Sequence, residues 1–225
     1  TLGIQMINPI PHEDERGFLA ETAKRSDVLK DFVLETAEFF DVPPGDSVEF
    51  DSGIVMTLDA EGVFEIGGHV VFCHRAGLRT IKVSQKSRFS AAERSYIVHL
   101  QGRSGVGPAV PAPIASDSVT MHIPPEKLVP DAVKGMILRN KTVYHPTWCK
   151  PGEMIDGVKI FDLPARMDGG VRRIVMGTQH DSYKGFDLHQ ANYSHTKEGV
   201  IKAFHYHERQ DDIWFFPSGR AKVVL

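Results

Sequence analysis

Two histidines, His205 and His207, stand one residue apart in a strand-like run near the end of the chain. Side chains of a β-strand alternate between its two faces, so this spacing places both imidazoles on the same face. Glycines bracket the segment at Gly199 and Gly219, and the acid Asp212 follows five residues after the second histidine. The pattern predicts one wall of a small β-barrel, with these two imidazoles and the Asp212 carboxylate facing its interior.

The remaining sequence also favours an all-β protein. Short apolar and β-branched runs recur between turn signals such as Pro43–Asp46 and Gly67-Gly68. Residues 18–33 could form either one helix face or a short strand at 18–21, and residues 124–136 could hold a short helix. We expect strands at 2–7, 48–58, 69–74, 78–83, 96–100, 158–163, 172–176, 186–193, 200–207, 213–216 and 220–225.

Composition restricts the class of protein and its compartment. The 225 residues can form one large domain or two small ones. The formal net charge of −3 gives no sign of the basic surface that a nucleic-acid-binding protein needs. We expect no membrane span and no secretory signal, because no apolar run is long enough. Two cysteines, Cys73 and Cys149, are too few for a disulfide framework, so we expect a cytoplasmic protein with reduced thiols.

The segment from Gly199 to His207 resembles the first motif of the cupin superfamily, with Asp212 where many cupins have Glu. With Gln190 and Asn192 before it, the segment is similar to the dTDP-4-dehydrorhamnose 3,5-epimerase family. There a Q-x-N-x-S strand precedes a G-V-x-R-x-x-H-Y strand. The resemblance covers roughly the last third of the chain. It implies a cupin-type double-stranded β-helix, or jelly roll, in 156–225, beside a β-rich domain in 1–150 that we expect to be related.

A second segment, Asp14-Glu15-Arg16-Gly17-Phe18-Leu19-Ala20-Glu21, resembles the family's D-x-R-G-x-F-x-E motif. In the family its Arg and Glu help to hold the nucleotide, and a guanidinium fork suits a diphosphate. The resemblance thus implies substrate-binding roles for Arg16 and Glu21. The segment lies far upstream of the histidine strand, so a plain charged turn is an equal alternative.

Gln190 and Asn192 are two residues apart on one expected strand, so they share a face. We expect them either to line the substrate pocket with His207 or, as an equal alternative, to form hydrogen bonds along the barrel.

The resemblance also implies a reaction. Hydrogens beside the ketone of a 4-keto sugar are acidic, and a neutral histidine is suited to removing them near pH 7. In the family the first histidine of the strand is this base, so His205 is the expected catalytic residue. We expect a dTDP-4-keto-6-deoxysugar or an analogue as substrate, and no cofactor. The family's Lys that stabilises the enolate corresponds in position to Asp212. The Asp that pairs with the catalytic histidine in the family would lie beyond Leu225. We therefore expect either that the barrel continues past the last residue or that strands from residues 40–145 complete its sheet.

Two alternatives stay open at the same residues. His205, His207 and Asp212 are a common ligand set for iron, manganese, nickel or zinc, which predicts a metal-dependent cupin. A sugar-binding module without catalysis would keep the pocket and lack the Lys. Family members are usually dimers with exchanged strands, so we expect a homodimer.

In the first half, His69, Cys73 and His74 lie close together, and for these we favour core packing over a reactive or zinc-binding site.

Overall fold

The computed structural model of the chain describes residues 4–15, 17–24, 26–75, 77–104, 152–155, 158–160, 163, 165–176, 187–200, 207, 211–221 and 223. Every regular element in these ranges is a β-strand and every ladder is antiparallel, so the predicted all-β class is confirmed. No helix in this part of the chain has the length and apolarity that a membrane span requires.

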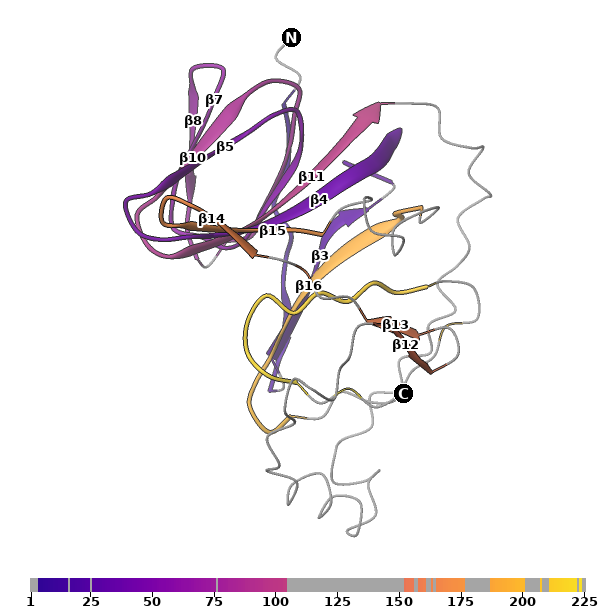
Figure 1. The fold of residues 1–225 in the computed structure, drawn as a ribbon. Coiled ribbons are helices and arrows are strands. Elements are labelled where there is room, and N and C mark those ends of the chain that lie inside the picture. Colours follow the sequence, from indigo (N-terminus) through magenta and orange to yellow (C-terminus); the bar gives the residue numbers. More distant parts are fainter. Residues whose placement is uncertain are drawn as a thin grey trace. The chain divides into compact units, whose positions relative to one another are not determined.

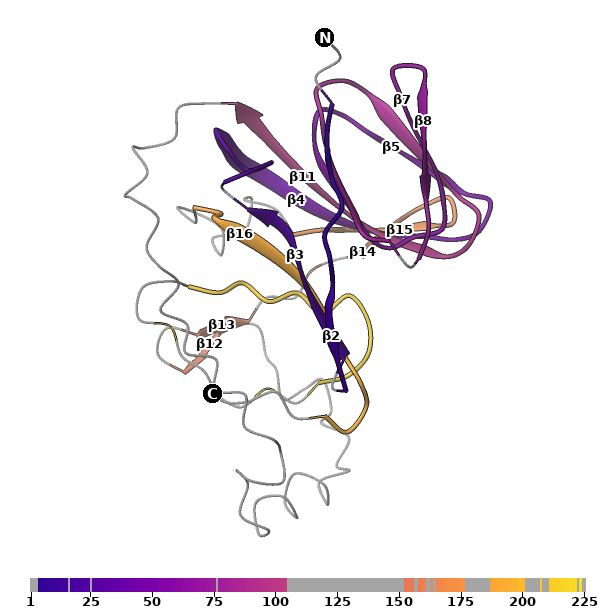
Figure 2. The ribbon, with the colours of Figure 1, turned by 180° about the vertical axis from the view of Figure 1, so that it is seen from behind.

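The chain forms two compact units, one of residues 1–109 with 144–197 and the other of 110–143 with 198–225. Four sheets belong to the first unit (Figures 1 and 2). The largest, in spatial order, contains β1 (Gln5–Ile7), β9 (Arg79–Val83), β6 (Gly53–Asp59), β11 (Ser95–Ser104), β4 (Phe32–Val42), β15 (Val171–Val175) and β14 (Ala165–Asp168). The next contains β5 (Ser47–Phe50), β10 (Ser87–Ala91), β7 (Gly62–Ile66) and β8 (His69–Cys73).

The two smaller sheets use strands from distant parts of the sequence. One contains β16 (Gln190–Thr196), β3 (Gly17–Lys24) and β2 (His12–Asp14). The other is the pair β12 (Gly152–Ile155) and β13 (Val158–Ile160). β15 pairs with β4 and β16 pairs with β3, so these ladders join residues from both predicted domains, 1–150 and 156–225. The domain division itself stays a prediction.

The hydrophobic core lies between the seven-stranded and the four-stranded sheet. Phe40 from β4 packs edge-to-face on Phe50 from β5, and Phe50 stacks on Phe64 from β7. Burying large aromatic side chains from two facing sheets removes much apolar surface from water, which drives the sheets together. The remaining buried members of this cluster are Val42, Val55, Ala60, Ile66, Cys73, Ile81, Val83, Phe89, Ala91, Ile97 and Val171.

Several strands differ from those expected. The helix alternative over 18–33 is wrong, because β3 and β4 occupy most of this region with a turn between them. β4 was not predicted, since Phe39 and Phe40 are both buried and a strand covered on both faces loses the alternating pattern. Residues 211–217 form no strand, although 213–216 was predicted. Trp214 and Phe216 are exposed, so this run lacks the burial that stabilises a strand. The expected helix at 124–136 and residues 201–206 of an expected strand lie outside the described residues.

Candidate functional site

Three of the predicted substrate-binding residues lie together on neighbouring strands. Glu21 on β3 is the register partner of Asn192 on β16, and Gln190 lies two residues before Asn192 on β16. The amide Nε2 of Gln190 donates to Asn192 Oδ1 at 2.8 Å and to Glu21 Oε1 at 3.5 Å, across 169 positions of sequence. The predicted common face of Gln190 and Asn192 is therefore confirmed. Both side chains are exposed, so their amides face solvent.

The ladder between β3 and β16 is held closely on both faces. A side chain at Gly17 would collide with the backbone carbonyl of His195, and its φ of 130° also favours glycine. On the face away from Gln190, Tyr193 packs edge-to-face on Phe18 with ring centroids 5.5 Å apart. Burial, and then the negative charge of Asp59, raises the pKa of the Tyr193 phenol. These contacts keep the polar face in place.

Sequence reasoning missed a cation beside this face. The ammonium group of Lys24 forms an ion pair with the Glu21 carboxylate, three residues earlier on β3. Residues three apart on an ordinary strand point to opposite faces, so strand spacing alone gave no signal for this contact. The Gln190–Asn192 face thus carries amide donors and acceptors, a carboxylate and one positive charge.

The second compact unit contains His207 and Asp212. Nε2 of His207 lies 3.1 Å from Oδ2 of Asp212, and the Trp214 indole N–H donates to the same oxygen at 3.4 Å. A carboxylate in this position can fix the orientation of an imidazole ring. Arg16 and His205 lie outside the described residues, so the structure places neither of them.

His207 and Asp212 would be two of the three ligands of the alternative metal set. The distance between their polar atoms is compatible with one shared ion, and imidazole with carboxylate suits a first-row metal. The part of the chain that the structure describes holds no group of three or more His, Cys, Asp or Glu side chains able to bind an ion. The third ligand of the predicted set, His205, is outside that part.

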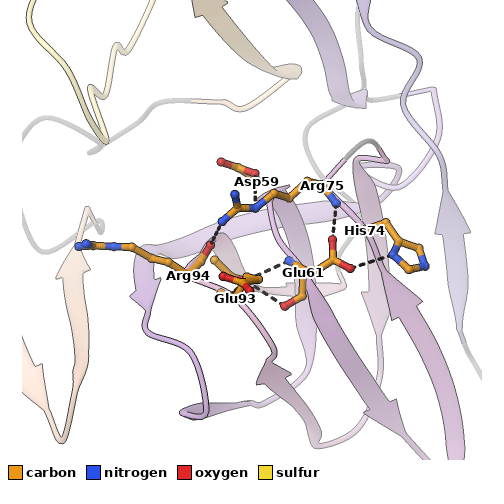
Figure 3. A network of polar contacts seen from close by, with 7 residues as sticks. Asp59, Glu61, His74, Arg75, Glu93 and Arg94 are labelled. Atoms are coloured by element: carbon orange, nitrogen blue, oxygen red, sulfur yellow. Dashed lines mark hydrogen bonds and ion pairs between the residues drawn. The ribbon is translucent and has the colours of Figure 1, made fainter.

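Cys73 lies in the core and His74 makes a contact at the surface. Cys73 is buried in the core, and burial raises the pKa of its thiol to about 11. His74 Nδ1 lies 3.0 Å from Glu61 Oε1, and the backbone N–H of Arg75 donates to the other oxygen of this carboxylate at 3.1 Å (Figure 3). These hydrogen bonds lower the pKa of Glu61. The preferred interpretation, core packing, is confirmed for Cys73 but is wrong for His69 and His74, whose side chains are exposed.

A buried polar cluster on β4, β11 and β15 was also missed. Arg173 pairs with Oε1 of Glu38, its Nε donating at 3.0 Å, and the Gln101 amide donates to Oε2 at 3.0 Å. The ring of His99 lies beside them, its Nδ1 3.4 Å from Gln101 Nε2. Had β4 been recognised as a strand, its alternation would have placed Glu38 inside with Phe40.

The Glu38 carboxylate is ionised despite its burial. Burial opposes ionisation, but the hydrogen bonds from His99 and Arg173 and the positive charge of Arg173 outweigh it. The pKa of Glu38 therefore lies below its ordinary value. The cluster therefore contains a carboxylate that stays negatively charged near neutral pH.

One curated protein is similar to part of this chain. Over 73 residues the chain is 48% identical to the spore coat polysaccharide biosynthesis protein SpsL of Bacillus subtilis (strain 168). The match covers 32% of this chain and 47% of that protein, so the chain spans about half the length of the curated relative it matches. No family model matches the sequence, and no solved structure matches it. The described part of the chain is thus β-rich, and a segment of the chain is similar in sequence to a polysaccharide biosynthesis protein.

Proposed function

We propose that this protein acts in carbohydrate biosynthesis as a nucleotide-sugar epimerase or isomerase. The similarity to a spore coat polysaccharide biosynthesis protein supports the biosynthetic role. The motif resemblance supports the finer assignment, which is proton abstraction from a dTDP-4-keto-6-deoxysugar or an analogue. On this proposal the protein works in the cytoplasm as a homodimer and needs no cofactor.

The contact of Glu21 with Gln190 and Asn192 is the observation that best supports the proposal. The resemblance assigns Glu21 to substrate binding, and strand alternation puts Gln190 and Asn192 on one face. The β3–β16 ladder joins the three although Glu21 is far from the other two in sequence. Amides and a carboxylate can exchange hydrogen bonds with the hydroxyl groups of a sugar or the polar edge of a base. Arg16 immediately precedes β3, so its proposed phosphate contact belongs to the same region of the chain.

The proposed chemistry is an enolisation. His205 takes the proton from C3 or C5 of the 4-keto sugar, and the electron pair of the broken C–H bond moves onto the ketone oxygen. Delivery of a proton from water or an acid on the opposite face inverts the carbon, and His205 releases the abstracted proton to solvent. Asp212 cannot offer the positive charge that a lysine would give the enolate. The proposal therefore expects slower epimerisation than exchange.

Deuterium exchange tests this proposal. In heavy water, the full-length protein should place deuterium at C3 or C5 of dTDP-4-keto-6-deoxyglucose, even where little epimer accumulates. The measurement is loss of the proton signals in NMR, with a boiled sample as control. Absence of exchange from several 4-keto nucleotide sugars would favour the binding module, which predicts saturable binding of the same sugars without exchange.

The metal-dependent alternative keeps one specific observation in its favour, the contact between His207 and Asp212. A proton-transfer site predicts purified protein without stoichiometric first-row metal. Elemental analysis should therefore find well under one iron, manganese, nickel or zinc per chain. About one ion per chain, lost on His207→Ala and retained in a His74→Ala control, would reverse the ranking of the two functions.

A further inference from the structure

One edge of the four-stranded sheet in the first unit is apolar and exposed. β8 is the outer strand of this sheet, and β7 is its only partner among the described strands (Figure 1). Two side chains of β8 are mainly exposed, Val70 at 52% and Phe72 at 64%. They project from the same face, because they are two residues apart on one strand. Such an edge presents free backbone N–H and C=O groups beside an apolar surface.

β8 lacks the protection that the other described edge strands have. Natural proteins usually protect a sheet edge with charged residues, with proline or by keeping the strand very short. β8 has five residues and contains no Asp, Glu, Lys, Arg or Pro. In contrast, β1 has only three residues, and the exposed side chains of β16 are polar. Each remaining edge strand contains a charged residue: Glu49 in β5, Glu13 and Asp14 in β2, Arg166 and Asp168 in β14, Glu153 in β12 and Lys159 in β13.

The sequence of β8 is complementary to an antiparallel copy of itself. With Val71 on a two-fold axis, all five residues pair, and Val70 lies opposite Phe72 of the partner subunit. An aromatic residue opposite a β-branched one is a favourable cross-strand pair, and the axis forms this pair twice. Val63 on β7 extends the apolar surface, because it is the register partner of Phe72. Glu65 is the partner of Val70 on β7, and both β8 strands separate it from Glu65 of the partner subunit. This separation is at least about 14 Å, three strand spacings, so the two acids repel each other little.

We propose that β8 is an interface between two copies of this chain, whose β8 strands pair antiparallel about Val71 and join two four-stranded sheets. The pairing uses the same surface on both copies and occupies the unprotected edge completely, so it closes at two copies. It is distinct from the strand exchange that the family resemblance implies. It uses no residue assigned to nucleotide-sugar chemistry, so it is present whether or not His205 is a base. With five paired residues per chain, the contact is small beside a standard interface, and we expect a dissociation constant in the micromolar range.

The mass of the assembly in solution tests the interface. In sedimentation equilibrium, the mass of the wild type should rise with concentration to twice that of Phe72→Lys. The substitution places an ammonium group against the apolar Val70 of the partner subunit, and losing a central aromatic contact should weaken association about tenfold or more. Met167→Lys is the matched control, because it replaces a side chain that is 65% exposed on another edge strand, β14, and it should associate as the wild type does. Equal masses of wild type and Phe72→Lys at every concentration would overturn the proposal, whether both are monomers or dimers formed elsewhere.

A pair of opposite charges then tests the register. Val70→Glu alone should weaken association as Phe72→Lys does. In an equimolar mixture of the two variants, the mixed dimer should form more tightly than either variant's own dimer. It places the new carboxylate opposite the new ammonium group and keeps one of the two original Val–Phe pairs. Native mass spectrometry distinguishes the three dimers by mass. A mixed dimer no more abundant than random pairing gives would overturn the antiparallel register about Val71.

Discussion

Replacing His205 by Asn is expected to slow deuterium exchange into a 4-keto nucleotide sugar by about 10²–10⁴-fold, the usual contribution of a general base. Asparagine keeps polarity and approximate size but cannot accept a proton near neutral pH. The rate is measured by NMR at saturating sugar, so that weaker binding does not enter. His74→Asn is the matched control, because His74 pairs with Glu61 at the surface of the first unit.

Two outcomes would contradict this role for His205. Exchange at the wild-type rate in His205→Asn would remove it as the base. Equal slowing in His74→Asn would mean that the rate reports general damage to the protein. His207→Asn adds a further distinction: a change in KM with unchanged kcat is expected if His207 binds the substrate.

Arg173→Ala is expected to lower the free energy of unfolding by about 3 kcal/mol, the lower end of the range for breaking a buried ion pair. The lower end applies because the Arg173 side chain is 40% exposed while that of Glu38 is only 4% exposed. The substitution leaves the Glu38 carboxylate buried without its main positive partner. Urea unfolding near neutral pH measures the effect, with Arg166→Ala on exposed β14 as the matched control.

The effect of Arg173→Ala should depend on pH in a defined direction. The pKa of folded Glu38 is depressed, so its stabilising contribution is present above the ordinary carboxyl pKa. That contribution is lost as the pH falls through the folded value, and the difference between wild type and Arg173→Ala should shrink on acidification. Replacing Glu38 and Arg173 together by leucine should cost much less than Arg173→Ala alone. A loss no greater than that of Arg166→Ala, or one independent of pH, would contradict this account.

Local patterns in the sequence were enough for the class of fold and for some of the face assignments. Turn residues such as Pro43–Asp46 and alternating runs such as 78–83 predicted strands and turns that the structure contains. Alternation also placed Gln190 and Asn192 on one face, because the two-residue period of a strand is a property of the backbone itself. The resemblance named Glu21, without indicating how it could reach the other two.

Only the tertiary structure decided which strands pair. The β3–β16 and β4–β15 ladders join segments separated by more than a hundred positions, and no local preference specifies such a partner. The same pairing made β4 a central strand and brought Glu38, His99 and Arg173 together in one polar cluster. Conversely, the apolar run at 213–216 formed no strand among the described residues. Strand propensity is local, whereas the backbone hydrogen bonds and the burial that stabilise a strand come from its neighbours.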